Sequence, residues 1–83
     1  DSKNQTKEDI VEGLLDKAVS NYGLSTRERE IAQLLYEGKN NNEIADILFL
    51  STNTIKVHAS NLYKKLGVSN RVQAIKVIRG EEV

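Results

Sequence analysis

Apolar residues recur along this chain at the three- and four-residue spacing of an amphipathic helix, and no stretch alternates with the two-residue period of a strand. The first helical pattern covers residues 7–22, after a polar tail at residues 1–5. Thr6 and Asp9 have the spacing of a capping pair where this helix begins, and Gly23 follows its end. The pattern therefore predicts an N-terminal amphipathic helix.

Start and stop signals divide the rest of the chain into four further helices. A serine or asparagine precedes each apolar-periodic segment, and in three of the four a Glu or Gln three residues later completes a capping pair. The predicted helices run from Ser25 to just before Gly38, over 41–48, over 52–66 and over 71–79, and four of the five glycines stand where a helix should end. The expected fold is all-α: a four-helix domain at residues 24–80, preceded by residues 1–23 with the polar tail and the extra amphipathic helix.

Composition limits what such a domain can be. The chain has 83 residues, enough for one small core, and it contains no Cys and a single His. A disulfide framework and a Cys-based metal site are therefore excluded, and no cofactor is expected. No apolar run reaches membrane-spanning length and no signal peptide is visible, so we expect a cytoplasmic location. The first residue is Asp1 rather than Met, which suggests a piece of a longer protein.

The formal net charge of zero conceals an asymmetry along the chain. Residues 1–50 contain ten Asp or Glu against six Lys or Arg, a balance of −4. Residues 51–80 contain six Lys or Arg and no acid, and Glu81 and Glu82 restore neutrality. A polyanion would therefore be attracted to the last third of the chain.

The predicted helix over 52–66 lies in this basic segment and has two different faces. At roughly 100° per residue, one narrow stripe is purely apolar, with Ile55, Ala59, Leu62 and Leu66. The opposite face carries Asn53, Val57, Ser60, Asn61 and Lys64, with Lys56 at its edge. It lacks the mixture of Glu and Lys that is usual on a merely solvated helix. One face is suited to burial, and the other to the major groove of DNA.

Only a short turn separates this helix from the one over 41–48, so the two are expected to form a helix-turn-helix. In that unit the second helix enters the major groove, with its N-terminal turns nearest the bases. The candidate base-reading residues are Asn53, Lys56, Val57, Ser60 and Asn61, and the candidate phosphate contacts are Lys64, Lys65 and Arg71. Tyr36 and Tyr63 are expected to be half-buried at helix contacts.

Four motifs stand in order along residues 24–79. They are Leu24-Ser25-x-Arg27-Glu28-x-Glu30, Gly38-x-x-Asn41-x-Glu43-Ile44-Ala45, Leu50-Ser51-x-x-Thr54-Ile55-Lys56-x-His58, and Lys65-Leu66-Gly67-Val68 with Arg71. Together they resemble the LuxR-type DNA-binding domain, also called GerE or NarL-type. The resemblance implies a four-helix domain that binds double-stranded DNA as a dimer at paired half-sites and regulates bacterial transcription.

The resemblance also implies roles for single residues. Base reading falls on Lys56, Val57 and Ser60, and backbone contact falls on Thr54, Lys65 and Arg71, with residue 42 at a further phosphate position. Two positions depart from the family's pattern. Residue 42 is often Lys in the family and is Asn42 here, which bears on that phosphate contact. Residue 60 is Lys in some members and is Ser here, which bears on the base preference.

The helix over 71–79 is the expected seam of a homodimer, where the resemblance also places the family's dimer contact. A half-site of a few base pairs cannot single out a genomic address, so we expect such domains to act in pairs. Val72, Ile75 and Ile78 form one stripe at three-residue spacing, and Val77 lies off it. The core is expected to cover one stripe and leave the other. Since the remaining patch is small, pairing only on DNA is compatible with this pattern.

Other classes of function remain open from the residues themselves. A sigma-factor region-4-like domain also uses a helix-turn-helix, but the ending from Lys65 to Val68, followed by Arg71, fits it less well. A helical protein-interaction module predicts acids among residues 51–80, where none occurs. An enzyme is disfavoured because no nucleophile–base pair is present. The resemblance further implies a larger regulator with an upstream receiver, ligand-sensing or membrane domain, and RNA polymerase as a possible partner. The helix before Tyr22 is similar to the segment that precedes the domain in the membrane-attached subgroup.

Overall fold

The computed structural model describes residues 6–81, most of which lie in five α-helices. They are α1 (Lys7–Tyr22), α2 (Thr26–Tyr36), α3 (Asn41–Leu48), α4 (Thr52–Leu66) and α5 (Arg71–Ile78). The described residues contain no strand, so the predicted all-α class is confirmed. The last helix ends at Ile78, one residue earlier than predicted. The predicted polar tail, residues 1–5, lies outside the described part of the chain.

Local hydrogen bonds explain where the helices begin. Capping boxes close in both directions at α1, α2 and α3; at α2 the Ser25 hydroxyl accepts from the Glu28 N–H, and the Glu28 carboxylate accepts from the Ser25 N–H at 2.8 Å. At α5 the Asn70 side chain accepts from the Gln73 N–H, but the Gln73 side chain accepts from the Ser69 N–H instead of from Asn70. The predicted capping pairs are therefore confirmed, with this change at the last one.

The predicted glycines stand just after the helix ends, and one further residue adopts the same left-handed backbone conformation. Gly23, Gly38, Gly67 and Gly80 all have φ between 67° and 89°. Phe49, at the end of α3, has φ of 57°, which costs a residue with a Cβ roughly 1–2 kcal/mol. The Leu50 N–H then donates to the Ala45 carbonyl at 2.9 Å and closes the turn into α4. The predicted tight turn is present, but its Phe49 side chain is 93% exposed.

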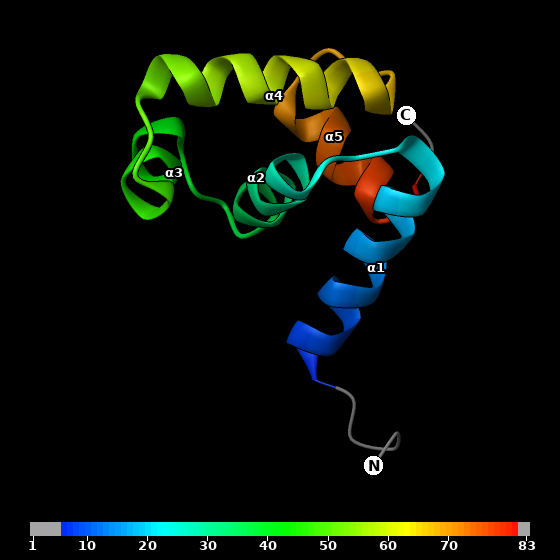
Figure 1. Cartoon of the computed structure of the whole chain (residues 1–83). Coiled ribbons are helices and arrows are strands. Elements are labelled where there is room, and N and C mark those ends of the chain that lie inside the picture. The colour runs from blue at the N-terminus through cyan, green and yellow to red at the C-terminus, as the bar shows by residue number, and fades with distance from the viewer. Residues whose placement is uncertain (1–5, 82–83) are drawn as a thin grey trace.

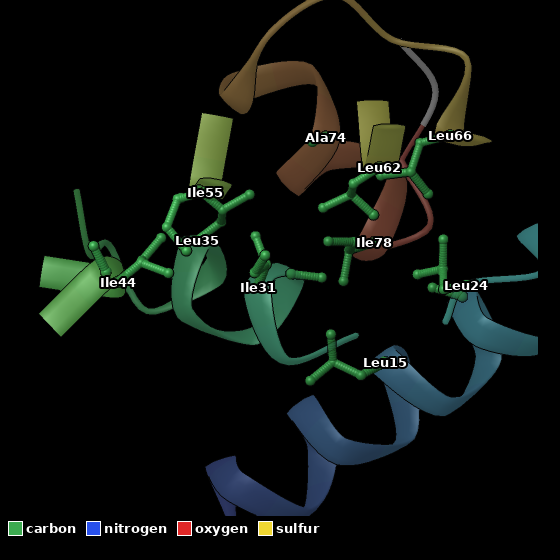
Figure 2. Close-up of a cluster of buried hydrophobic side chains, with 13 residues drawn as sticks. Leu15, Leu24, Ile31, Leu35, Ile44, Ile55, Leu62, Leu66, Ala74 and Ile78 are labelled. Atoms are coloured by element: carbon green, nitrogen blue, oxygen red, sulfur yellow. The ribbon is translucent and has the colours of Figure 1, made fainter. Parts of the chain in front are cut away.

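One apolar core joins all five helices. The large side chains buried almost completely are Leu15, Ile31, Leu35, Ile44, Ile55 and Leu62. In Figure 1, α4 runs across the top of the molecule, with α2 and α5 beneath it and α3 under its N-terminal end. The predicted apolar stripe of α4 is buried along its whole length, and Figure 2 shows two of its members, Ile55 and Leu62, directed toward α2 and α5. The outward face of α4 is thereby left uncovered by the other helices.

Helix α1 packs on the core from Val11 onward and not through its first turn. Leu15 and Ala18 are buried against α2 and α5, whereas Ile10 is 48% exposed where α1 leads away on the side opposite α4 (Figure 1). The guanidinium of Arg29 on α2 binds the middle of α1 by ion pairs with Asp16 at 2.8 Å and Glu12 at 3.0 Å. From Val11 onward α1 therefore packs on the four-helix domain.

An ion pair joins the start of α2 to the end of α4. Glu28 at the start of α2 is 5% exposed, and its carboxylate accepts from the Lys65 ammonium at 2.7 Å. The same ammonium donates to the Gly23 carbonyl at 3.1 Å. Burial by itself raises the pKa of the Glu28 carboxyl, but the hydrogen bonds from Lys65 and Ser25, together with the charge of Lys65, lower that pKa below its usual value of about 4.5.

The low pKa of Glu28 predicts how stability depends on pH. Since the folded-state pKa lies below the unfolded one, the contribution is complete above about pH 4.5 and is lost as the pH falls through the folded-state pKa. We expect Glu28→Gln to lower the free energy of unfolding at pH 7 by about 1–3 kcal/mol and to differ less from the wild type at pH 3. Urea unfolding at both pH values measures this.

The exposed Glu37, at the end of α2, provides the control. Glu37→Gln should change the free energy of unfolding by less than about 0.5 kcal/mol at pH 7. If the gap between Glu28→Gln and the wild type is the same at pH 3 and pH 7, the ionised carboxylate does not hold this junction together.

Candidate nucleic-acid interface

The outward face of α4 carries all five residues predicted to read bases. Asn53, Lys56, Val57, Ser60 and Asn61 are exposed. They are exposed because the core takes the opposite stripe of the same helix, so burial on one side fixes which residues are presented on the other. Exposure of the Val57 isopropyl side chain places an apolar group amid polar ones, as contact with a thymine methyl would require.

The N-terminal end of α4 is organised by Ser51. Its hydroxyl accepts from the Thr54 N–H at 3.1 Å and lies 2.8 Å from the Thr54 hydroxyl. The first turn of α4 contains no acidic residue, and its last turn contains Lys64 and Lys65. The positive end of the helix dipole is thus not neutralised by a side chain of the first turn, which favours an anion in its vicinity.

The residues predicted to contact the DNA backbone, apart from the half-buried Thr54 described above, fall into two groups. Asn42 and Lys64 are exposed, and Lys64 has no salt-bridge partner among residues 6–81. Lys65 and Arg71 already have partners inside the chain: Lys65 binds Glu28, and the Arg71 guanidinium donates to the Lys39 carbonyl in the turn before α3. These two cations stabilise the fold in the free chain, a role that the sequence did not indicate.

The apolar residues of α5 do not share one environment. Ile78, expected at the dimer contact, is only 2% exposed and belongs to the core of the single chain with Ala74. Val72, which was placed on the same stripe, is 63% exposed, and Ile75 and Val77 are half-buried. In α5 the core covers residues 74 and 78, which lie four residues apart on one edge of the helix. This edge faces inward where α5 crosses α2 and α4.

A groove lies along one flank of α4. Its walls come from α4, from the first residue of α3 and from the turn between α4 and α5, and its volume is about 380 Å³. Its polar lining residues are Asn41, Lys56, Ser60, Tyr63, Lys64 and Ser69. The sequence did not indicate this groove or the presence of Asn41, Tyr63 and Ser69 in it, because the turn brings Ser69 back beside α4 and no local pattern indicates this.

Other kinds of site find no support in the described residues. Within residues 6–81 no group of three or more His, Cys, Asp or Glu side chains could hold a metal ion. None of the described helices has the length and apolar character that crossing a membrane requires.

The predicted half-buried state of Tyr36 and Tyr63 is confirmed, and both rings pack against the core.

The arrangement of α3, a three-residue turn and α4 with a free outward face defines a helix-turn-helix domain. The family model described as "Bacterial regulatory proteins, luxR family" matches residues 22–78. The chain belongs to this family, as the four sequence motifs predicted.

Curated relatives agree with this membership. The chain is 54% identical over 52 residues to the "Probable csgAB operon transcriptional regulatory protein" of Salmonella typhimurium, covering 63% of this chain and 24% of that protein. It is 48% identical over 52 residues to the "Spore germination protein GerE" of Bacillus subtilis, covering 63% of this chain and 70% of that protein. It is 44% identical over 59 residues to the "Transcriptional regulatory protein LiaR" of the same organism, covering 71% of this chain and 28% of that protein.

Proposed function

We propose that this chain is the DNA-binding domain of a bacterial transcription regulator and that it binds double-stranded DNA through the outward face of α4. One observation carries the proposal. Burial of a single apolar stripe holds α4 on the surface with a face of short polar residues and lysines and without any acid. Family membership favours this function over a sigma-factor region-4-like domain and over a helical protein-interaction module.

Base reading is assigned to the exposed residues of α4. The Lys56 ammonium can donate to guanine O6 or N7, and the Val57 side chain can contact a thymine methyl. The short side chains of Asn53, Ser60 and Asn61 allow close approach of the helix to base edges and offer hydrogen-bonding groups to them. The preferred base sequence then depends on which of these groups meet a partner, since a wrong base leaves them unpaired.

Backbone contact is assigned first to Lys64, with Asn42 and Thr54 as further contacts near the start of the two helices. Lys65 and Arg71 contribute by holding α4 and the start of α5 in place through Glu28 and the Lys39 carbonyl. A role of these two cations at phosphate would require them to exchange or share partners on binding.

The domains and partners of the full-length protein are also proposed, because this chain covers only 24% of the length of the csgAB regulator. One similar relative, 47% identical over 53 residues, is the "Uncharacterized response regulatory protein YgeK" of Escherichia coli. We infer an upstream receiver, ligand-sensing or membrane domain that controls this one, action on the chromosome in the cytoplasm, and RNA polymerase as a partner.

A homodimer completes the proposal. Val72, 63% exposed on α5, and the half-buried Ile75 one turn further form the apolar surface available to a second copy, whereas Val77 lies off this stripe, beside α1. A two-fold contact here would set two recognition helices about one DNA turn apart on a pseudo-palindromic site. The surface is small, which supports pairing on DNA rather than in free solution.

Base reading by Lys56 is tested by comparing a selected duplex with a random one. Selection from a pool of random duplexes first supplies the best site. Lys56→Ala should weaken binding to that site by about 1–3 kcal/mol and to a scrambled duplex by much less. Lys17→Ala, which removes the same charge from an exposed position of α1, should weaken both equally and slightly. Equal losses on both duplexes for Lys56→Ala would mean that Lys56 only positions the domain.

The two adjacent lysines at the end of α4 separate phosphate binding from folding. Because each phosphate contact releases counterions, Lys64→Ala should reduce the slope of log affinity against log salt by about one unit and leave the melting temperature unchanged. Lys65→Ala should instead lower the melting temperature, since Glu28 loses its partner, with little change in slope. An equal loss of slope in both variants would place Lys65 at a phosphate as well.

Pairing through α5 is tested at its most exposed apolar residue. Val72→Asp should leave the circular dichroism and the melting temperature unchanged, reduce cooperative binding to a duplex with two half-sites by about tenfold, and barely change binding to one half-site. Ile10→Asp, on the exposed half of α1, is the matched comparison. Loss of cooperativity in Ile10→Asp but not in Val72→Asp would place the dimer contact on α1 instead of α5.

A further inference from the structure

The groove beside α4 borders the face assigned to base reading and shares Lys56 and Ser60 with it. On a helical wheel of roughly 100° per residue, Lys56 and Tyr63 lie on one flank of the outward face, and Thr54 and Lys65 lie on the other. The second flank meets the junction of α1 and α2, where Glu28 and the Gly23 carbonyl bind Lys65. The first flank opens into the groove of about 380 Å³. Of the two flanks of α4, the first therefore has a groove beside it, whereas the second is occupied by contacts with the rest of the domain.

The chemistry of the groove suits a polyanion. Two lysines, Lys56 and Lys64, stand on its α4 wall, and none of the described residues that line it is acidic. The hydroxyls of Tyr63 and Ser69 and the amide of Asn41 add neutral hydrogen-bond donors. A larger groove between α1 and α2, of about 580 Å³, is lined by Glu8, Glu12 and Glu37 and would repel the same ligand.

Duplex geometry indicates what the groove receives. A helix that enters the major groove has a sugar–phosphate strand on each side, because the two backbones form the walls of that groove. With the outward face of α4 at the bases, its hollowed flank faces one of these walls. Val68 and Ala59 supply apolar surface to the same groove, which suits contact with deoxyribose between phosphates.

We propose that this groove holds the sugar–phosphate backbone of one DNA strand, with the Tyr63 and Ser69 hydroxyls and the Asn41 amide donating to phosphate oxygens. The proposal rests on the DNA-binding function proposed above and adds three residues to it. The Tyr63 ring packs against the core, so its hydroxyl is held by a rigid side chain and costs little ordering on binding. These contacts carry no base information, and they fix how far α4 rotates about its axis in the groove.

Removal of single hydroxyls tests the proposal in the 83-residue chain. Tyr63→Phe keeps the ring in the core and should weaken binding roughly tenfold or more on both the selected duplex and a scrambled one, as expected for a lost hydrogen bond to a charged group. Ser69→Ala should weaken both by about threefold or more. Tyr36→Phe removes the same hydroxyl from α2, where Tyr36 lines the acidic groove, and should bind like the wild type.

A second measurement changes the DNA and combines that change with Tyr63→Phe. Single phosphates of the selected duplex are replaced one at a time by neutral methylphosphonates, and wild-type affinity is measured for each. Substitution at adjacent phosphates of one strand should weaken wild-type binding, and at one of them Tyr63→Phe should bind no worse than the wild type. That shared loss would identify the phosphate that Tyr63 contacts.

The outcomes separate this proposal from the function on which it rests. A wild-type chain that selects no duplex contradicts the DNA-binding function itself. A wild type that binds and depends on Lys56, while Tyr63→Phe and Ser69→Ala bind as tightly as Tyr36→Phe, overturns the groove alone. Additive losses from Tyr63→Phe and every methylphosphonate would likewise show that Tyr63 does not meet the backbone.

Discussion

The structure depends above all on burial of the apolar stripe of α4. Ile55, Leu62 and Leu66 from this stripe enter a core shared with α2, α3 and α5. Full burial of each such side chain is worth about 1.5–3 kcal/mol, whereas an ion pair with one partly exposed partner contributes about 1 kcal/mol or less. The stripe therefore sets where α4 lies and which face it turns outward. The pair of Lys65 with Glu28 then fixes its C-terminal end against the α1–α2 junction.

The same packing explains why the domain is electrostatically divided. The acids of the first half are used within the fold: Glu28 and Glu43 close capping boxes, and Glu12 and Asp16 bind Arg29. The lysines of α4 that lie on the outward face have no such partners within the described residues. Net neutrality is thus compatible with a polyanion-binding surface, because the opposite charges are held on different sides of one small molecule.

Much of the fold could be predicted because its signals are local. Capping pairs, helix-ending glycines and the period of apolar residues each act within one or two turns, and all five helices begin and end within about two residues of the expected positions. The five candidate base-reading residues were predicted as exposed for the same reason, since the opposite stripe of one helix had to be buried. Contact of these residues with DNA does not follow from their exposure, but the family membership supports it.

By itself, the sequence determined the helices, the helix-turn-helix and the identity of the face that α4 presents. Tertiary structure alone decided the partners of Lys65 and Arg71, which lie 37 and 32 residues away in the chain. It also decided that Ile78 belongs to the core while Val72 does not, and that Asn41, Tyr63 and Ser69 meet beside α4. The physical reason is common to these cases. The period of apolar residues shows which side of a helix is apolar. The way neighbouring helices cross then determines which edge of that side is covered and which residues distant in the chain become neighbours.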